Sequence, residues 1–236
     1  MQTQSNPRKG VIITSDNVMA DVVNRNFNIL PILSRLSIPL GFNHKTVGEV
    51  CADAGIDTEV FLFIVNFLLY DNLSQIEPTI SNAIGVTDFL QRSHDYFLNY
   101  KFPHIRTNLL DSFESCHADI NPAIERFLDG YINQVRRHFS HENEVVFPYI
   151  KSLATDSPAN YSISIFRKAH EEINEKLSDL KNIILRYYST SKPDKMYDVL
   201  VDIYNCEDDL NSHALIENCI LIPMVEKIEK SNQRHS

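Results

Sequence analysis

Apolar residues recur every three or four positions along most of this 236-residue chain, which is the spacing of one face of an α-helix. The pattern predicts four long helical segments, at residues 86–116, 122–154, 158–190 and 194–230. Six glycines, no tryptophan and no sustained alternation of apolar and polar residues agree with this assignment. The sequence therefore predicts an all-α protein whose C-terminal part, residues 85–231, is a four-helix bundle.

The N-terminal part reads as a smaller helical domain, residues 1–75. An apolar run from Glu59 to Tyr70 predicts a buried helix there, and Asp57 or Thr58 can cap it. The polar stretch around Pro78 predicts a linker at residues 76–84.

Three prolines fall inside the predicted long helices: Pro103, Pro148 and Pro223. Proline lacks a backbone N–H, so each should kink or end its helix. Since Pro148 and Pro223 each follow a histidine by ten residues, we interpret them as matched bends.

That match belongs to a longer repeat. The pattern H-x-x-x-E-N-x-x-x-x-P occurs at residues 138–148 and again at residues 213–223. The i, i+4 spacing places His138 with Glu142, and His213 with Glu217, on one helix face. Two further histidines, His94 and His170, precede these motifs by 44 and 43 residues. The region therefore resembles two similar helical hairpins.

The hydrophobic register predicts that these polar groups face the core. The second long helix has the seam Ile124, Leu128, Tyr131, Val135, His138, Glu142, Val145 and Tyr149. The third has Ile163, Phe166, His170, Ile173, Leu177, Leu180, Ile184 and Tyr187. The fourth has Val199, Ile203, Cys206, Leu210, His213, Glu217, Ile220 and Met224.

A carboxylate buried without a counter-charge costs several kcal/mol or more. No lysine or arginine occupies a predicted core position of these three helices, so a bound metal ion is the simplest counter-charge. The bundle would bring six ligands to one level. They are His94, His138, Glu142, His170, His213 and Glu217.

Four imidazoles and two carboxylates suit a pair of iron or manganese ions, about 3.5 to 4 Å apart. If both glutamates bridge, each metal has two histidines and two carboxylate oxygens, and an oxo or hydroxo bridge can fill further positions. Open positions favour small ligands such as dioxygen, nitric oxide or peroxide. We expect His104, His117 and His141 to lie at the surface or at helix ends, with a supporting role open to His141. Asn143 and Asn218 could orient the acids, but we expect them to be exposed.

Composition limits the other function classes. A net charge of −9 argues against nucleic acid or an anionic membrane as a partner. The first residues show no secretory signal, and no apolar run could span a bilayer. Four cysteines without C-x-x-C spacing fit a reducing cytoplasm. No hydrolase or transferase signature is present, and no catalytic residue is assigned.

The histidine and glutamate series resembles the hemerythrin-like (HHE cation-binding) family. The segment SHDYFLNYKFPHIR at residues 93–106, with the N-terminal domain and the total length, resembles more specifically the di-iron proteins that repair iron–sulfur clusters, the RIC (ScdA/YtfE-like) group. This resemblance implies that the six residues hold two non-haem iron ions bridged by both glutamates. It also implies damaged iron–sulfur proteins as partners.

The chain departs from that group at Gly41 and Phe42, about where the group carries a cysteine pair. Only Cys51 remains nearby, and we read it as a small buried apolar residue. The leading hypothesis is a cytoplasmic di-iron protein that supports repair of iron–sulfur clusters under oxidative or nitrosative stress, with iron donation as its candidate mechanism. Alternatives are a reductase of nitric oxide or peroxide, a module that binds dioxygen or nitric oxide, and a metal-free bundle. The sequence leaves the metal, the electron donor, the clients and the oligomeric state open.

Overall fold

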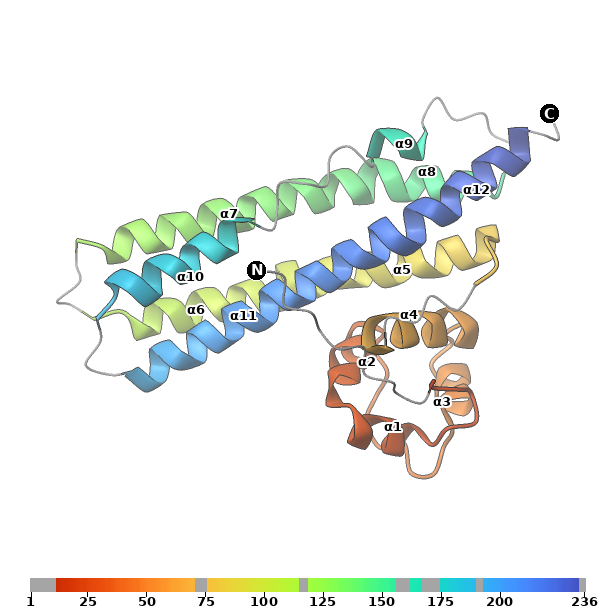
Figure 1. The fold of residues 1–236 in the computed structure, drawn as a ribbon, viewed down its shortest axis with the longest axis horizontal. Helices are drawn as coiled ribbons and strands as arrows, with labels where there is room; N and C mark the ends of the chain where they lie inside the picture. The colour runs from red at the N-terminus through yellow and green to blue at the C-terminus, as the bar shows by residue number, and fades with distance from the viewer. Residues whose placement is uncertain are drawn as a thin grey trace. The chain divides into compact units, whose positions relative to one another are not determined.

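The computed structural model describes residues 12–70, 76–114, 119–155, 162–166, 175–189 and 193–233. Within these residues every regular element is a helix, which confirms the all-α prediction (Figure 1). The chain forms two compact units, Met1–Arg92 and Ser93–Ser236, and each is described by itself. Among the described helices, none combines the length and the apolar character needed to cross a membrane.

The first unit holds mostly short helices. They are α1 (Met19–Arg25), the 3-10 turn η1 (Phe27–Ile29), α2 (Leu30–Arg35), α3 (Val47–Asp53) and α4 (Thr58–Tyr70). Thr46 and Glu49 form a reciprocal capping box at the start of α3. The carboxylate of Asp57 accepts hydrogen bonds from the amides of Glu59 and Val60, so Asp57 caps α4 as the sequence indicated.

The first long helix begins earlier and ends earlier than residues 86–116. It runs through α5 (Ile80–Tyr96), η2 (Phe97–Lys101) and α6 (Phe102–Ser112). Its start follows Thr79, whose hydroxyl oxygen accepts a hydrogen bond from the amide of Asn82 at 3.2 Å. Part of the predicted linker at 76–84 is therefore helical, because the Thr79 cap lies inside it. The division into units falls within α5, and the domain boundaries stay a prediction.

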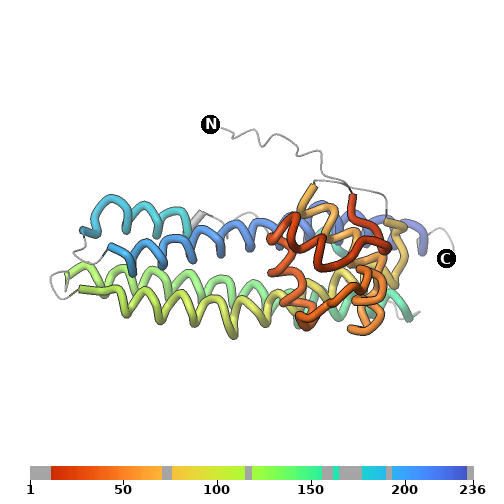
Figure 2. Tube along the Cα trace, turned by 90° about the horizontal axis from the view of Figure 1, so that it is seen from below, coloured from red at the N-terminus to blue at the C-terminus, as the bar shows by residue number. Residues whose placement is uncertain are grey.

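The second unit contains the remaining long segments. These are α7 (Asn121–His141), η4 (Glu142–Val146) and α8 (Phe147–Ser152), then α9 (Ile163–Phe166) and α10 (Glu175–Tyr187), then α11 (Pro193–Ile216), η5 (Glu217–Leu221) and α12 (Ile222–Gln233). Helices α6, α7, α10 and α11 lie side by side and contact one another, which gives a four-helix bundle (Figures 1 and 2).

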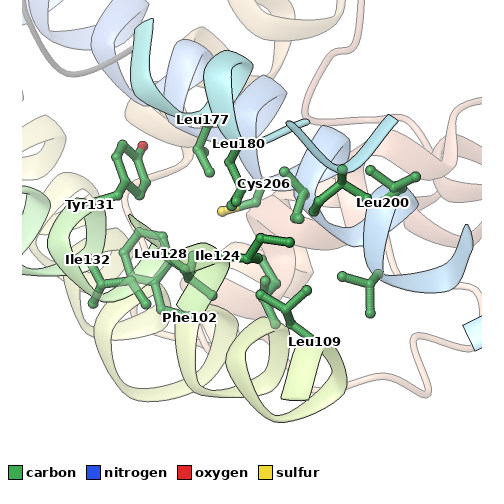
Figure 3. Close-up of a cluster of buried hydrophobic side chains, with 14 of the residues drawn as sticks. Phe102, Leu109, Ile124, Leu128, Tyr131, Ile132, Leu177, Leu180, Leu200 and Cys206 are labelled. Carbon is green, nitrogen blue, oxygen red and sulfur yellow. The ribbon is translucent and has the colours of Figure 1, made fainter. Parts of the chain in front are cut away.

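The core of this bundle is built from all four helices (Figure 3). Leu128 of α7, Leu180 of α10 and Ile203 of α11 are buried there, as their seams predicted. At the end of the third seam the prediction is wrong, because Tyr187 is exposed and Tyr188 is buried. Helix α10 ends at Tyr187, so the helical spacing no longer applies to the next residue.

The three internal prolines neither end nor sharply interrupt their helices. Each follows a five-residue π-helical turn by two positions: η2 before Pro103, η4 before Pro148 and η5 before Pro223. A π-turn widens the helix where proline offers no N–H, so the helix continues. The sequence did not predict these π-turns, and the interpretation of Pro148 and Pro223 as matched bends stays a prediction. The wide turn η4 also shifts the register, so Val146 is buried where the sequence predicted Val145, which is 37% exposed.

Candidate metal centre

Four of the predicted ligands converge in the second unit. His94 lies in the last turn of α5, His213 lies near the end of α11, and Glu142 and Glu217 are the first residues of η4 and η5. One donor atom from each lies within 4.8 Å of all the others, and all four side chains are buried. The i, i+4 repeat on α11 and η5 holds the His213–Glu217 pair, with Nε2 and Oε1 3.0 Å apart.

The separations between these donor atoms suit a metal ion. His94 Nε2 lies 3.2 Å from His213 Nε2 and 3.0 Å from Glu142 Oε2. Two donors at right angles around a metal, each roughly 2.1 Å from it, would be about 3.0 Å apart. The residues present therefore fit a bound cation.

Glu142 faces histidines with both of its oxygens. Oε2 lies near His94, whereas Oε1 lies 2.8 Å from His138 Nε2, one helical turn earlier. The side chain of His138 is 13% exposed, while those of His94 and Glu142 are fully buried. One carboxylate thus separates a His94 side from a His138 side, which is the geometry that a bridging carboxylate requires.

Asn143 is not exposed, contrary to the expectation from sequence. It is half-buried, and its Oδ1 lies 3.0 Å from His94 Nδ1. A carboxamide oxygen only accepts hydrogen bonds, so the Nδ1–H of His94 is the donor. With its proton on Nδ1, His94 presents the Nε2 atom to Glu142 and His213, where it could serve as a metal ligand.

Aromatic rings enclose this part of the site. The His94 ring stacks on Phe139 with centroids 3.9 Å apart and on Phe147 at 5.4 Å. The ring of Phe97 meets that of His213 edge-on at 6.1 Å. These contacts surround the donors with apolar surface, which strengthens electrostatic interactions within the site.

The other predicted residues divide into three groups. His170 and His117 lie outside the described residues, so their predicted roles stay predictions. His141 and Asn218 are exposed. His104 lies near the surface, with Nε2 3.3 Å from Asp202 Oδ2.

One assumption about the core helices is wrong. Lys181 of α10 is buried, although the sequence seams contained no lysine or arginine. Its ammonium group pairs with Glu207 of α11 and lies 4.1 Å from the centre of the Tyr204 ring. The alkyl part of a lysine side chain can cover apolar surface while its ammonium group pairs with a carboxylate, so a lysine can occupy the buried face of a helix. This lysine is thus engaged by an acid outside the His/Glu cluster.

The sequence model described as "Hemerythrin HHE cation binding domain" matches residues 85–225, which is more than half of the chain. Searches of curated proteins and of solved structures gave no match. The matched range includes every residue of the buried His/Glu cluster. The chain therefore belongs to the hemerythrin HHE cation-binding domain family.

Proposed function

We propose that this chain is a cytoplasmic non-haem di-iron protein that supports the repair of iron–sulfur clusters damaged by oxidative or nitrosative stress. The observation that carries the metal role is the buried set of four donors within 4.8 Å. The repair role is supported by the resemblance of residues 93–106 and of the chain length to the cluster-repair group. Damaged iron–sulfur proteins are its proposed partners, and iron is its proposed cargo.

In this proposal His94 and His213 hold one metal together with Glu142 Oε2 and Glu217, whose donor atoms lie together. His138 and Glu142 Oε1 hold the other, because these two atoms are 2.8 Å apart. By the sequence repeat, His170 completes the second position. Bound iron at such a site supplies one-electron chemistry and exchangeable coordination positions.

Repair of a damaged client tests the proposal. A nitric oxide-damaged iron–sulfur enzyme is incubated with iron-loaded wild type, metal-free wild type, and a protein carrying both Glu142→Ala and Glu217→Ala. We expect recovery of client activity only with the iron-loaded wild type, because the variant lacks both proposed carboxylate ligands. Glu144→Ala, which changes an exposed acid beside the site, is the matched control and should behave as wild type. Equal recovery with metal-free protein would contradict iron supply.

A second candidate is the binding or reduction of a diatomic ligand such as nitric oxide, or of peroxide. The observation that favours it is the apolar surface beside His94, where the rings of Phe139 and Phe147 stack on the imidazole. Apolar surroundings suit an uncharged ligand such as nitric oxide better than an ion. Multiple turnovers of nitric oxide or peroxide by reduced protein would support a reductase. Reversible binding at one equivalent would instead support a sensor.

A further inference from the structure

We infer that Asn143 is a positioning residue, which orients His94 so that its Nε2 faces the His/Glu cluster. The inference rests on the proposed metal role of that cluster. It gives a role to the asparagine of the first H-x-x-x-E-N motif and none to the asparagine of the second.

The contact joins two different elements of the fold. His94 lies in α5 and Asn143 lies in η4, next to Glu142, and the Oδ1–Nδ1 distance is 3.0 Å. Because the amide oxygen accepts only, it selects the form of the ring with its proton on Nδ1. The Nε2 lone pair then remains for a metal ion. Consecutive residues of one π-turn thus supply a carboxylate donor and the group that orients a histidine donor.

Packing alone does not set this orientation. The ring of His94 lies nearly parallel to that of Phe139, with 13° between the planes, and to that of Phe147, with 16°. Stacking fixes the plane of the imidazole but not its tautomer, that is, which ring nitrogen carries the proton. Without Asn143, the form with Nε2–H would gain a hydrogen bond to Glu142 Oε2 at 3.0 Å, and that form cannot bind a metal.

The second motif provides a matched control. Asn218 follows Glu217 as Asn143 follows Glu142, and it is also in the second position of a π-turn. Its side chain is exposed, whereas that of Asn143 is half-buried. The two asparagines therefore share their sequence context but differ in burial, and Asn143 is the one hydrogen-bonded to His94.

Zinc affinity gives the first test, measured by competition with a chromogenic chelator for wild type, Asn143→Ala, Asn143→Asp and Asn218→Ala. Loss of a group that orients a metal-binding histidine lowers affinity by about 10- to 100-fold. We expect that loss for Asn143→Ala, and near wild-type affinity for Asn143→Asp, which keeps the acceptor.

The second readout is specific to His94. In zinc-loaded, ¹⁵N-labelled wild type, the Nδ1–H resonance of His94 should be visible and protected from exchange with water. It should persist in Asn143→Asp and Asn218→Ala and be lost to fast exchange in Asn143→Ala. A loss of packing alone would lower the unfolding temperature without removing this one resonance.

The outcomes separate the two proposals. Wild type that binds no zinc and no iron would defeat the metal role itself. Wild type that binds zinc, with Asn143→Ala equal to it in affinity and in the His94 resonance, would overturn only the role of Asn143. If Asn143→Ala does not fold, the wild-type spectrum still decides, because absence of a protected His94 Nδ1–H contradicts the hydrogen bond.

Discussion

Two buried glutamates, Glu142 and Glu217, connect the stability of this protein with its proposed function. Each is fully buried in the second unit with a histidine one helical turn earlier: His138 Nε2 lies 2.8 Å from Glu142, and His213 Nε2 lies 3.0 Å from Glu217. Burying a carboxylate is costly unless charge or hydrogen bonds compensate it. At the scale of single residues, the site is therefore expected to destabilise the metal-free protein.

This expectation gives a direct prediction. Replacing both acids by glutamine (Glu142→Gln with Glu217→Gln) removes two buried charges with little change in volume. We predict that the metal-free variant is more stable to urea than metal-free wild type by about 1–3 kcal/mol. Its metal affinity should fall at the same time. A metal-free variant that is less stable than wild type would show that the acids stabilise the bundle through other contacts.

The cysteines make a second prediction at this scale. Burial raises the pKa of the Cys51 thiol to about 11, although a hydrogen bond with Thr58 acts in the opposite direction. The reactive thiolate is therefore scarce at pH 8 and increases only as the pH approaches 11. Cys219 is exposed.

Alkylation of the native protein at pH 8, read by peptide mass spectrometry, should modify Cys219 and leave Cys51 intact. Cys206, which is also buried, should behave as Cys51 does. Rapid alkylation of Cys51 under these conditions would argue for thiol chemistry in the first unit.

At the scale of elements, the π-turns place the acids. Glu142 and Glu217 each begin a π-turn, and each turn leads into a proline two positions after its last residue. In η4 the amide of Phe147 bonds to the carbonyl of Glu142, five residues earlier. The wide turn therefore satisfies the helix where Pro148 provides no donor.

A deletion cycle tests this account of η4. Deleting Val145, an exposed residue of the turn, should force an α-helical register in which Pro148 clashes with the preceding turn. We predict a cost of about 3 kcal/mol or more in urea unfolding. Adding Pro148→Ala to the deletion should recover much of that loss, while Pro148→Ala alone should change stability little. Strictly additive effects would contradict a coupling between the proline and the π-turn.

These elements also show what the sequence could and could not predict. The seams predicted the burial of Glu142, His213 and Glu217. A histidine and a glutamate four residues apart within the apolar face of a long helix must point to the same side as that face. The seam missed Val146, because a π-turn inserts one residue without a sequence signal other than the proline after it.

The role of Asn143 was missed for a different reason. Its partner, His94, belongs to another helix, and the sequence alone does not specify which side chains meet across a bundle. The burial of Lys181 was missed for a related reason, because it depends on Glu207, an acid of a neighbouring helix.

At the scale of the whole molecule, every donor that the structure brings together belongs to the second unit, Ser93–Ser236. A metal that binds only the folded protein, and not the unfolded chain, raises the free energy of unfolding. The increase is about 2.7 kcal/mol at a free metal concentration 100 times the dissociation constant. We predict that metal binding slows hydrogen exchange in α7 and α11, whose ends hold His138 and His213. The amides of α1 to α4 should change much less. Equal protection throughout the chain would contradict this localisation.

The central claim is that the six predicted ligands hold a pair of iron ions. It is tested most directly by elemental analysis and near-ultraviolet absorption of iron-reconstituted wild type, beside the variant with Glu142→Ala and Glu217→Ala. We predict about two irons per chain, with an absorption band from a bridged iron pair, and loss of both in the variant. Wild type that holds no iron after anaerobic reconstitution, or a variant that retains it, would contradict the di-iron site.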